Sequence, residues 1–291
     1  MTILVTGSTG TIGARIVEVL HGAGAPVRAM ARDPSKGKFP AGVETAAGDL
    51  GDPEAVRAAL KGVRTLFLLN AVVPDELTQA LMVLGLAREA GIERIVYFSV
   101  LKAESSSDVP HFAGKFAAER MLAERGMAAT VLRPAYFMQN DAQLRQPIAE
   151  QGVYPMPVGS RGVAMVDAED IAGVAAAELR RRDAAAEPLP REVVEIPGPE
   201  ALTGEGIAAA WAEALGRAVR YAGDDLDAYE RASAGKMPGW MAYDMRRMFG
   251  RFQEEGMTAA AGAGERVEAI LGRKRRRYRD FAAETAARWK G

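Results

Sequence analysis

Three glycines near the start of the chain constrain its fold more than any other feature. Gly7, Gly10 and Gly13 follow the short apolar run Ile3–Thr6 and open a segment with apolar residues at helical spacing, Thr11–His21. In a strand–turn–helix unit, the first glycine permits the sharp turn, the second lets a pyrophosphate approach the backbone, and the third lets helix and strand pack closely. The helix dipole then faces the phosphates. The motif predicts a dinucleotide-binding turn rather than an empty glycine-rich turn, with the candidate contacts Gly7, Thr9, Gly10, Thr11, Ile12 and Gly13.

The rest of the first half alternates short apolar runs with helical stretches. Runs that are apolar throughout and separated by helices are typical of parallel strands covered on both faces. This order predicts an α/β fold with a doubly wound, Rossmann-type parallel sheet. The predicted strands are Ile3–Thr6, Pro26–Ala31, Val43–Ala47, Thr65–Leu69, Arg94–Val100 and Ala129–Leu132, and the predicted helices are Thr11–His21, Asp52–Leu60, Asp75–Ala90 and Lys115–Arg125.

The alternation weakens in the second half, where prolines cluster. Helices are predicted at Ala168–Arg181, Thr203–Leu215 and Arg266–Gly272, and Thr258–Gly264 is predicted to be a loop. We therefore expect a Rossmann domain at residues 1–150 and a smaller C-terminal α+β substrate-binding lobe at residues 151–291, partly interleaved with the first.

Composition excludes several kinds of chemistry. The chain has 291 residues, no cysteine and two histidines, so neither thiol catalysis nor a metal site is expected. Its formal net charge of −1 argues against a general nucleic-acid binder. No apolar run approaches the roughly 20 residues of a membrane span. We expect a cytoplasmic monomer or homodimer with a small-molecule substrate and without nucleic-acid or membrane partners.

The run Arg273–Arg277 is strongly basic and could in principle bind nucleic acid. Consecutive basic residues wrap around a helix instead of forming one face. A solvated C-terminal surface is therefore the favoured interpretation.

Arg32 follows the second predicted strand, where NAD-binding proteins usually carry an acidic residue that holds the ribose 2′-hydroxyl. Its guanidinium would instead attract a 2′-phosphate, with Lys36 and Lys38 close by. This predicts NADP(H) as the cofactor; the alternative is a solvated basic loop. Asp49, after the next strand, is placed to accept a hydrogen bond from the adenine amino group or to cap a turn. Further candidate contacts with the cofactor are Leu50 and Asn70.

Ser99 ends a predicted strand at the carboxyl edge of the sheet, where doubly wound folds bind ligands. His111 and Lys115 are four residues apart, so on a helix they would share one face and could meet the nicotinamide ribose together. A lysine there can donate to ribose hydroxyls and lower the pKa of a neighbouring acid. The alternatives are an exposed helix lysine and a histidine that caps a helix after Pro110.

Together with later segments, these residues resemble the NmrA-like proteins, a group of atypical short-chain dehydrogenase/reductases. The resemblance rests on the glycine motif, Arg32, Asp49, Ser99 and Lys115, and on the segments Leu132–Asn140, Val166–Ala172 and Ile196–Thr203. The first segment is the most specific because ordinary Rossmann proteins lack it. The resemblance implies that it lines the cofactor and substrate cleft, with Phe137 as a cofactor contact. One departure is His111, which stands where short-chain dehydrogenases carry a tyrosine acid.

The resemblance implies an NADPH-dependent oxidoreductase that transfers hydride to a small conjugated or aromatic acceptor, such as a quinone or an enone. Lys115 would position the ribose, and His111, Tyr136 or water would donate a proton. Tyr136 and Phe137 would form an aromatic wall of the pocket or pack in the core.

Two alternatives follow from the same residues. Loss of the tyrosine acid favours a non-catalytic NADP(H)-sensing regulator that acts through a protein partner. Epimerase, lyase or cyclase chemistry is also compatible with this fold. A methionine-rich group is more often ordinary core or an interface, but it could form an apolar lid over the pocket: Met156, Met237, Trp240, Met241, Met245 and Met248.

Overall fold

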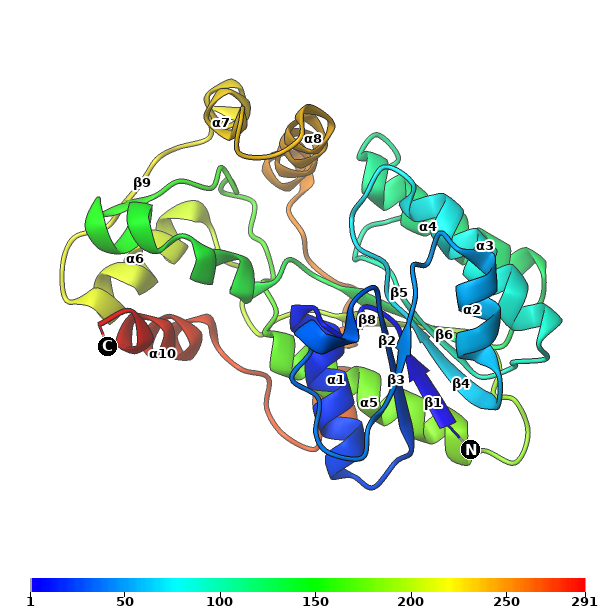
Figure 1. Cartoon of the computed structure of the whole chain (residues 1–291). Coiled ribbons are helices and arrows are strands. Elements are labelled where there is room, and N and C mark those ends of the chain that lie inside the picture. Colours follow the sequence, from blue (N-terminus) through cyan, green and yellow to red (C-terminus); the bar gives the residue numbers. More distant parts are fainter. Residues whose placement is uncertain (1, 291) are drawn as a thin grey trace. The chain divides into compact units, whose positions relative to one another are not determined.

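Within residues 2–290, which the structure describes, the apolar runs pair into a seven-stranded sheet in the order β3-β2-β1-β4-β5-β6-β8 (Figure 1). The structure is a computed structural model. β1 pairs in parallel with β2 on one side and β4 on the other, which is the strand-order reversal of a doubly wound sheet. The predicted Rossmann-type fold is confirmed. The strands are β1 (Thr2–Val5), β2 (Val27–Ala31), β3 (Glu44–Ala47), β4 (Val63–Leu68), β5 (Ile95–Phe98), β6 (Ala129–Pro134) and β8 (Glu192–Ile196).

Helices cover both faces of this sheet (Figure 1). On one face, alternate strand residues such as Leu66 and Leu68 pack with Val83 and Leu84 in one buried cluster. Figure 1 shows α1 and α5 on the opposite face. Two covered faces explain why a central strand such as β5 is buried along its whole length, whereas the edge strand β3 is largely exposed. The helices are α1 (Thr11–Gly22), α2 (Pro53–Leu60), α3 (Glu76–Glu89), α4 (Pro110–Glu124) and α5 (Ala168–Ala184).

The local start of α2 agrees with its predicted capping. The Asp52 carboxylate accepts a hydrogen bond from the Glu54 amide at 2.9 Å, and Pro53 is the first helical residue. Helix α4 begins at Pro110, earlier than its predicted start at Lys115. Proline at a first helical position loses no hydrogen bond, so the helix can start there. His111 and Lys115 therefore lie on one helix.

The described residues divide into two compact units. The first consists of the chain up to Ala103, His111–Arg133 and Glu169–Val194, and the second of Glu104–Pro110, Pro134–Ala168 and the chain from Glu195 onward. The chain passes between the units several times, and the Rossmann sheet includes β8, which follows residue 150. Among the described helices, none has the length and hydropathy that crossing a bilayer requires.

The second unit is mostly helical, with a two-stranded parallel sheet formed by β7 and β9. Its elements are the short helices η2 (Met138–Gln143) and η3 (Gln146–Glu150), β7 (Val153–Tyr154), α6 (Gly204–Leu215), β9 (Arg220–Tyr221), α7 (Leu226–Ser233), α8 (Gly239–Glu255), α9 (Ala263–Leu271) and α10 (Tyr278–Lys290). In the first unit, η1 (Pro34–Lys36) follows β2.

The basic run Arg273–Arg277 is largely engaged in ion pairs. The ion-pair partners are Glu268 for Lys274 and Arg275, Asp167 and Glu284 for Arg276, and Glu200 for Arg277, at 2.6–3.3 Å. Arg275 also donates to the Gly198 carbonyl at 2.7 Å. The run thus fastens the segment before α10 within its own unit, which supports a structural role.

The second unit contains a buried carboxylate. Asp141 is fully buried and accepts hydrogen bonds from the hydroxyls of Tyr278 at 2.5 Å and Tyr154 at 3.4 Å. The Trp211 indole donates to the Tyr278 hydroxyl at 2.8 Å. Burial raises the pKa of Asp141 to about 7, although the two tyrosine hydroxyls oppose that shift. The folded state therefore holds a proton that an unfolded aspartate would release near pH 4.

We expect Asp141→Asn to flatten the dependence of stability on pH. In the wild type the folded state binds more protons than the unfolded state between about pH 4 and pH 7, so its free energy of unfolding falls across that interval, by a few kcal/mol. An amide does not ionise and loses this slope. Urea unfolding from pH 4 to pH 8 measures it, with the exposed Asp280→Asn as the matched control. Parallel curves for wild type and Asp141→Asn would contradict the assignment.

Candidate functional site

The three glycines form the turn between β1 and α1. Gly7 has a φ of 61°, and a Cβ there would collide with the Leu69 side chain. A Cβ on Gly13 would lie 2.7 Å from the Gly7 carbonyl carbon and 2.9 Å from the Ser8 Cα. Gly10 is the N-cap of α1 and offers no side-chain cap. The first amides of α1 are therefore left for an anion at the helix N-terminus.

Two hydroxyls that the sequence analysis did not single out hold this turn in place. The Thr6 hydroxyl donates to the Leu69 carbonyl at 2.9 Å and accepts from the Leu69 amide at 2.8 Å. The Ser8 hydroxyl donates to the Met30 carbonyl at 2.8 Å. These bonds fix the turn to the ends of β4 and β2, at the carboxyl edge of the sheet.

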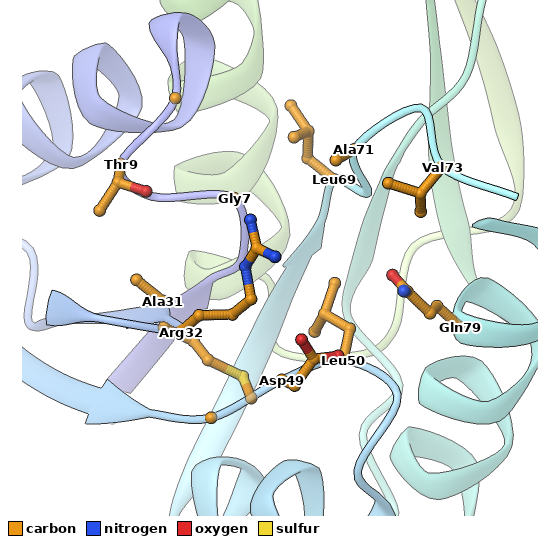
Figure 2. A pocket seen from close by; sticks show the side chains of 13 residues that line it. Gly7, Thr9, Ala31, Arg32, Asp49, Leu50, Leu69, Ala71, Val73 and Gln79 are labelled. Atoms are coloured by element: carbon orange, nitrogen blue, oxygen red, sulfur yellow. The ribbon is translucent and has the colours of Figure 1, made fainter. Parts of the chain in front are cut away.

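A cavity of about 350 Å³ opens beside the turn (Figure 2). Six predicted cofactor residues line it: Gly7, Thr9, Gly10, Arg32, Asp49 and Leu50. Seven residues that the sequence analysis missed also line it: Met30, Ala31, Gly48, Leu69, Ala71, Val73 and Gln79. They come from the carboxyl ends of β2, β3 and β4 and from α3. Most are apolar, so only their position after a strand could have indicated them.

Arg32 is the cation among the residues that line this cavity. Its side chain is exposed, and in Figure 2 it extends from the end of β2 beside Thr9 and Asp49. The neighbouring Asp33 is engaged in its own turn, where its carboxylate accepts from the Ser35 amide at 3.1 Å and the Ser35 hydroxyl at 2.5 Å. Asp33 is thus engaged in the turn after β2 and does not line the cavity, whereas Arg32 does.

Asp49 stabilises a turn and also lines the cavity, and its contact with adenine stays a prediction. Its Oδ1 accepts a hydrogen bond from the Gly51 amide at 2.7 Å, so the side chain stabilises the turn after β3. The same side chain is exposed and lines the cavity next to Leu50. Turn formation therefore orients a carboxylate toward the ligand space.

Asn70 follows β4 and is 6% exposed. Neither its amide nitrogen nor its amide oxygen has a hydrogen-bond partner in the described protein. A buried amide without partners costs about 1–3 kcal/mol for each unsatisfied group, so such a side chain is typical of a ligand contact. Its neighbours in sequence, Leu69 and Ala71, both line the cavity.

Ser99 and Lys115 are both buried, and each contacts a different carboxylate. The Ser99 hydroxyl donates to Glu119, whose carboxylate also accepts from Arg133 at 2.6 Å. Lys115 forms an ion pair with Glu76 at 2.7 Å. Lys115 is 6% exposed, so it is not the exposed helix lysine of the alternative interpretation.

The remaining predicted residues have other surroundings. Thr11 is the exposed first residue of α1, Ile12 is buried in the core, and half-buried His111 packs edge to face against Phe112 with ring centroids 4.6 Å apart. Tyr136 and Phe137 belong to the second unit. There the Tyr136 ring contacts Phe249 and Phe252 of α8 at centroid distances of 6.0 and 5.8 Å.

Burial raises the pKa of Tyr136 well above 10. A proton donor works best when its pKa lies near the operating pH, so this shift disfavours Tyr136 as the acid.

In the methionine-rich group, Met248 is buried, Trp240 is exposed, and the other members are partly buried: Met156, Met237, Met241 and Met245. The apolar lid stays a prediction.

Comparison with known proteins gives full-length similarities. The sequence profile of the NmrA-like family matches residues 1–280. The NAD(P)H azoreductase of Xenophilus azovorans is 35% identical over 290 residues, 98% of each chain. The (4-alkanoyl-5-oxo-2,5-dihydrofuran-3-yl)methyl phosphate reductase of Streptomyces griseus is 33% identical with the same 98% coverage of both chains. The structure of NADPH-dependent quinone oxidoreductase from Escherichia coli complexed with NADPH is 25% identical, with a TM-score of 0.83 and 100% of both chains covered.

Proposed function

Because this chain belongs to the NmrA-like family, we propose that it is an NADP(H)-dependent oxidoreductase that reduces small aromatic or conjugated acceptors. The observation that supports this most directly is the cavity beside the glycine turn, where the exposed Arg32 guanidinium faces the ligand space and Asp33 is held away in its own turn. The azoreductase relative and the quinone oxidoreductase structure support the acceptor class.

The residues at this edge of the sheet fit the parts of NADP(H). The turn around Gly7 and Gly13 has no room for side chains, so a pyrophosphate can approach the backbone at the N-terminus of α1. Arg32 would bind the 2′-phosphate through charge-assisted hydrogen bonds. Asp49 would accept from the adenine amino group, and the buried Asn70 amide would gain the partners that it lacks.

NADPH, when bound, would supply the hydride that reduces the acceptor. Lys115 would donate hydrogen bonds to the nicotinamide ribose hydroxyls and so orient the ring. Hydride addition to a conjugated acceptor leaves negative charge on a heteroatom, which must take up a proton. His111, on the same helix as Lys115, or water would donate it, because the raised pKa of Tyr136 makes this phenol a weak acid.

We expect the purified protein to oxidise NADPH when a quinone, an azo dye or an enone is added, and to oxidise NADH more slowly at the same concentration. Loss of NADPH absorbance measures the rate, with acceptor-free and protein-free reactions as controls. Binding of NADPH without reduction of any acceptor would contradict the reductase. That result would favour the NADP(H)-sensing regulator, which a difference in partner binding between NADP⁺ and NADPH would then test.

A further inference from the structure

The charge of Lys115 is balanced by a residue from a different helix. We propose that Glu76 is a positioning residue, which holds the Lys115 ammonium at the carboxyl end of β5 in the orientation that meets the cofactor ribose. The inference rests on the proposed function, because it assumes that Lys115 contacts NADP(H). It adds a residue that no sequence motif indicates, since Glu76 and Lys115 are far apart in the chain.

The geometry fixes both ends of this contact. The Lys115 Nζ lies 2.7 Å from the Glu76 Oε1, and each side chain is 8% exposed. The same Nζ donates to the carbonyl of Phe98, the last residue of β5, at 3.4 Å. An ammonium has three N–H donors on a flexible four-carbon stem. Two protein acceptors restrict that stem and leave a donor for a ligand hydroxyl.

The contact with Glu76 is held by charge. Oε1 of Glu76 receives no well-aligned hydrogen bond among the described residues, although the lysine nitrogen is within ion-pair distance. Glu76 is also the first residue of α3, where the helix dipole favours a negative charge. One turn further along α3, Gln79 lines the cofactor cavity. Helix α3 therefore contributes both to the cavity wall and to the placement of Lys115.

The buried carboxylate on α4 itself, that of Glu119, is not available for this role. Glu119 is one turn further along α4, but its oxygens accept from the Ser99 hydroxyl and from the Arg133 guanidinium at 2.6 and 3.1 Å. Tyr97 cannot supply a negative charge either, because burial and then the charges of Glu76 and Glu119 hold its pKa well above 10. Without Glu76, the ammonium would be a buried cation without a counter-charge and would turn to other acceptors or to solvent.

A double-mutant cycle over Glu76→Gln and Lys115→Met tests the inference. Glu76→Gln should weaken NADPH binding, by no more than Lys115→Met does, and should lower kcat roughly tenfold while the KM for the acceptor stays nearly constant, because misplacement of Lys115 affects the cofactor contact and the reacting geometry more than acceptor binding. Lys115→Met should weaken NADPH binding several-fold, and the double variant should be no worse than Lys115→Met alone. Glu76→Asp should recover part of the kcat. Glu89→Gln, on the exposed far end of α3, is the matched control and should behave as wild type.

NADPH affinity is measured by fluorescence titration, which needs no acceptor and so does not depend on turnover. Wild-type protein that reduces no acceptor would overturn the proposed function, and the affinity cycle would still decide the role of Glu76. Losses that add in the double variant would overturn the inference alone, as would full activity of Glu76→Gln. If Glu76→Gln does not fold, Lys115→Met is compared with the double variant, which has neither charge. Weaker NADPH binding by the double variant would then refute the positioning role.

Discussion

Replacing Gly13 by alanine is expected to abolish NADPH binding and to lower the free energy of unfolding by about 3 kcal/mol. The added Cβ would lie 2.7 Å from the Gly7 carbonyl carbon and 2.9 Å from the Ser8 Cα. Both neighbours are backbone atoms, so a side-chain rotation cannot relieve the overlap. Helix α1 would have to move away from the turn, and its N-terminal amides would no longer face the pyrophosphate. Fluorescence titration with NADPH and urea unfolding measure the two effects.

Gly22→Ala is the matched control for this variant. Gly22 ends the same helix, and a Cβ there meets no atom within 4 Å. Its NADPH affinity should equal that of the wild type, and its stability should change by less than about 1 kcal/mol. Wild-type NADPH affinity in Gly13→Ala would mean that the turn is not where the pyrophosphate binds.

The fold of the first unit could be predicted because its determinants are local. Apart from the edge strand β3, the strands from β1 to β6 are short, largely apolar runs with a helix or turn after each, and the Asp52-Pro53 start of α2 is a capping signal readable from two residues. Strand β8 was missed. Its sequence, Glu192–Ile196, alternates charged and apolar residues, and it joins the sheet through pairing that is distant in sequence.

The helices of the second unit were harder to predict for a related reason. Helix α8 was foreseen only as a group of methionines and a tryptophan, and α10 begins directly after the basic run. Tertiary contacts stabilise α10, because the Tyr278 hydroxyl joins the Trp211 indole at 2.8 Å and the buried Asp141 at 2.5 Å. Such contacts leave no periodic pattern in a single sequence.

The candidate site also has a part that the sequence predicts and a part that only the structure reveals. The glycine turn, Arg32 and Asp49 were predictable because each occupies a fixed place after a strand. The role of Glu76 was not predictable, because its partner Lys115 is on another helix and only the folded chain brings the two together. Asn70 was predicted as a cofactor contact, but only the structure shows that its buried amide has no hydrogen-bond partner among the described residues.

Arg32→Asp is expected to weaken NADPH binding roughly 100-fold and to leave NADH binding within about threefold of the wild type. Arg32 is exposed and lines the cavity, so its guanidinium can form charge-assisted hydrogen bonds with the 2′-phosphate. An aspartate removes these bonds and repels the phosphate, whereas it can accept from the 2′-hydroxyl of NADH. Titrations with NADPH and with NADH, at low and at high salt, measure the preference for NADPH.

Lys38→Asp separates a local contact from a general charge effect. Lys38 is exposed, lies on the same loop and does not line the cavity, yet its substitution changes the net charge by the same amount. At physiological ionic strength, salt screens exposed charges beyond about 8 Å. The substitution of Lys38 should therefore change NADPH affinity only weakly. Equal losses of NADPH affinity in both variants would mean that the preference for NADPH over NADH comes from the total positive charge of the loop and not from a contact with Arg32. An equal loss of NADH affinity in Arg32→Asp would show that Arg32 supports the adenosine site as a whole and does not recognise the 2′-phosphate.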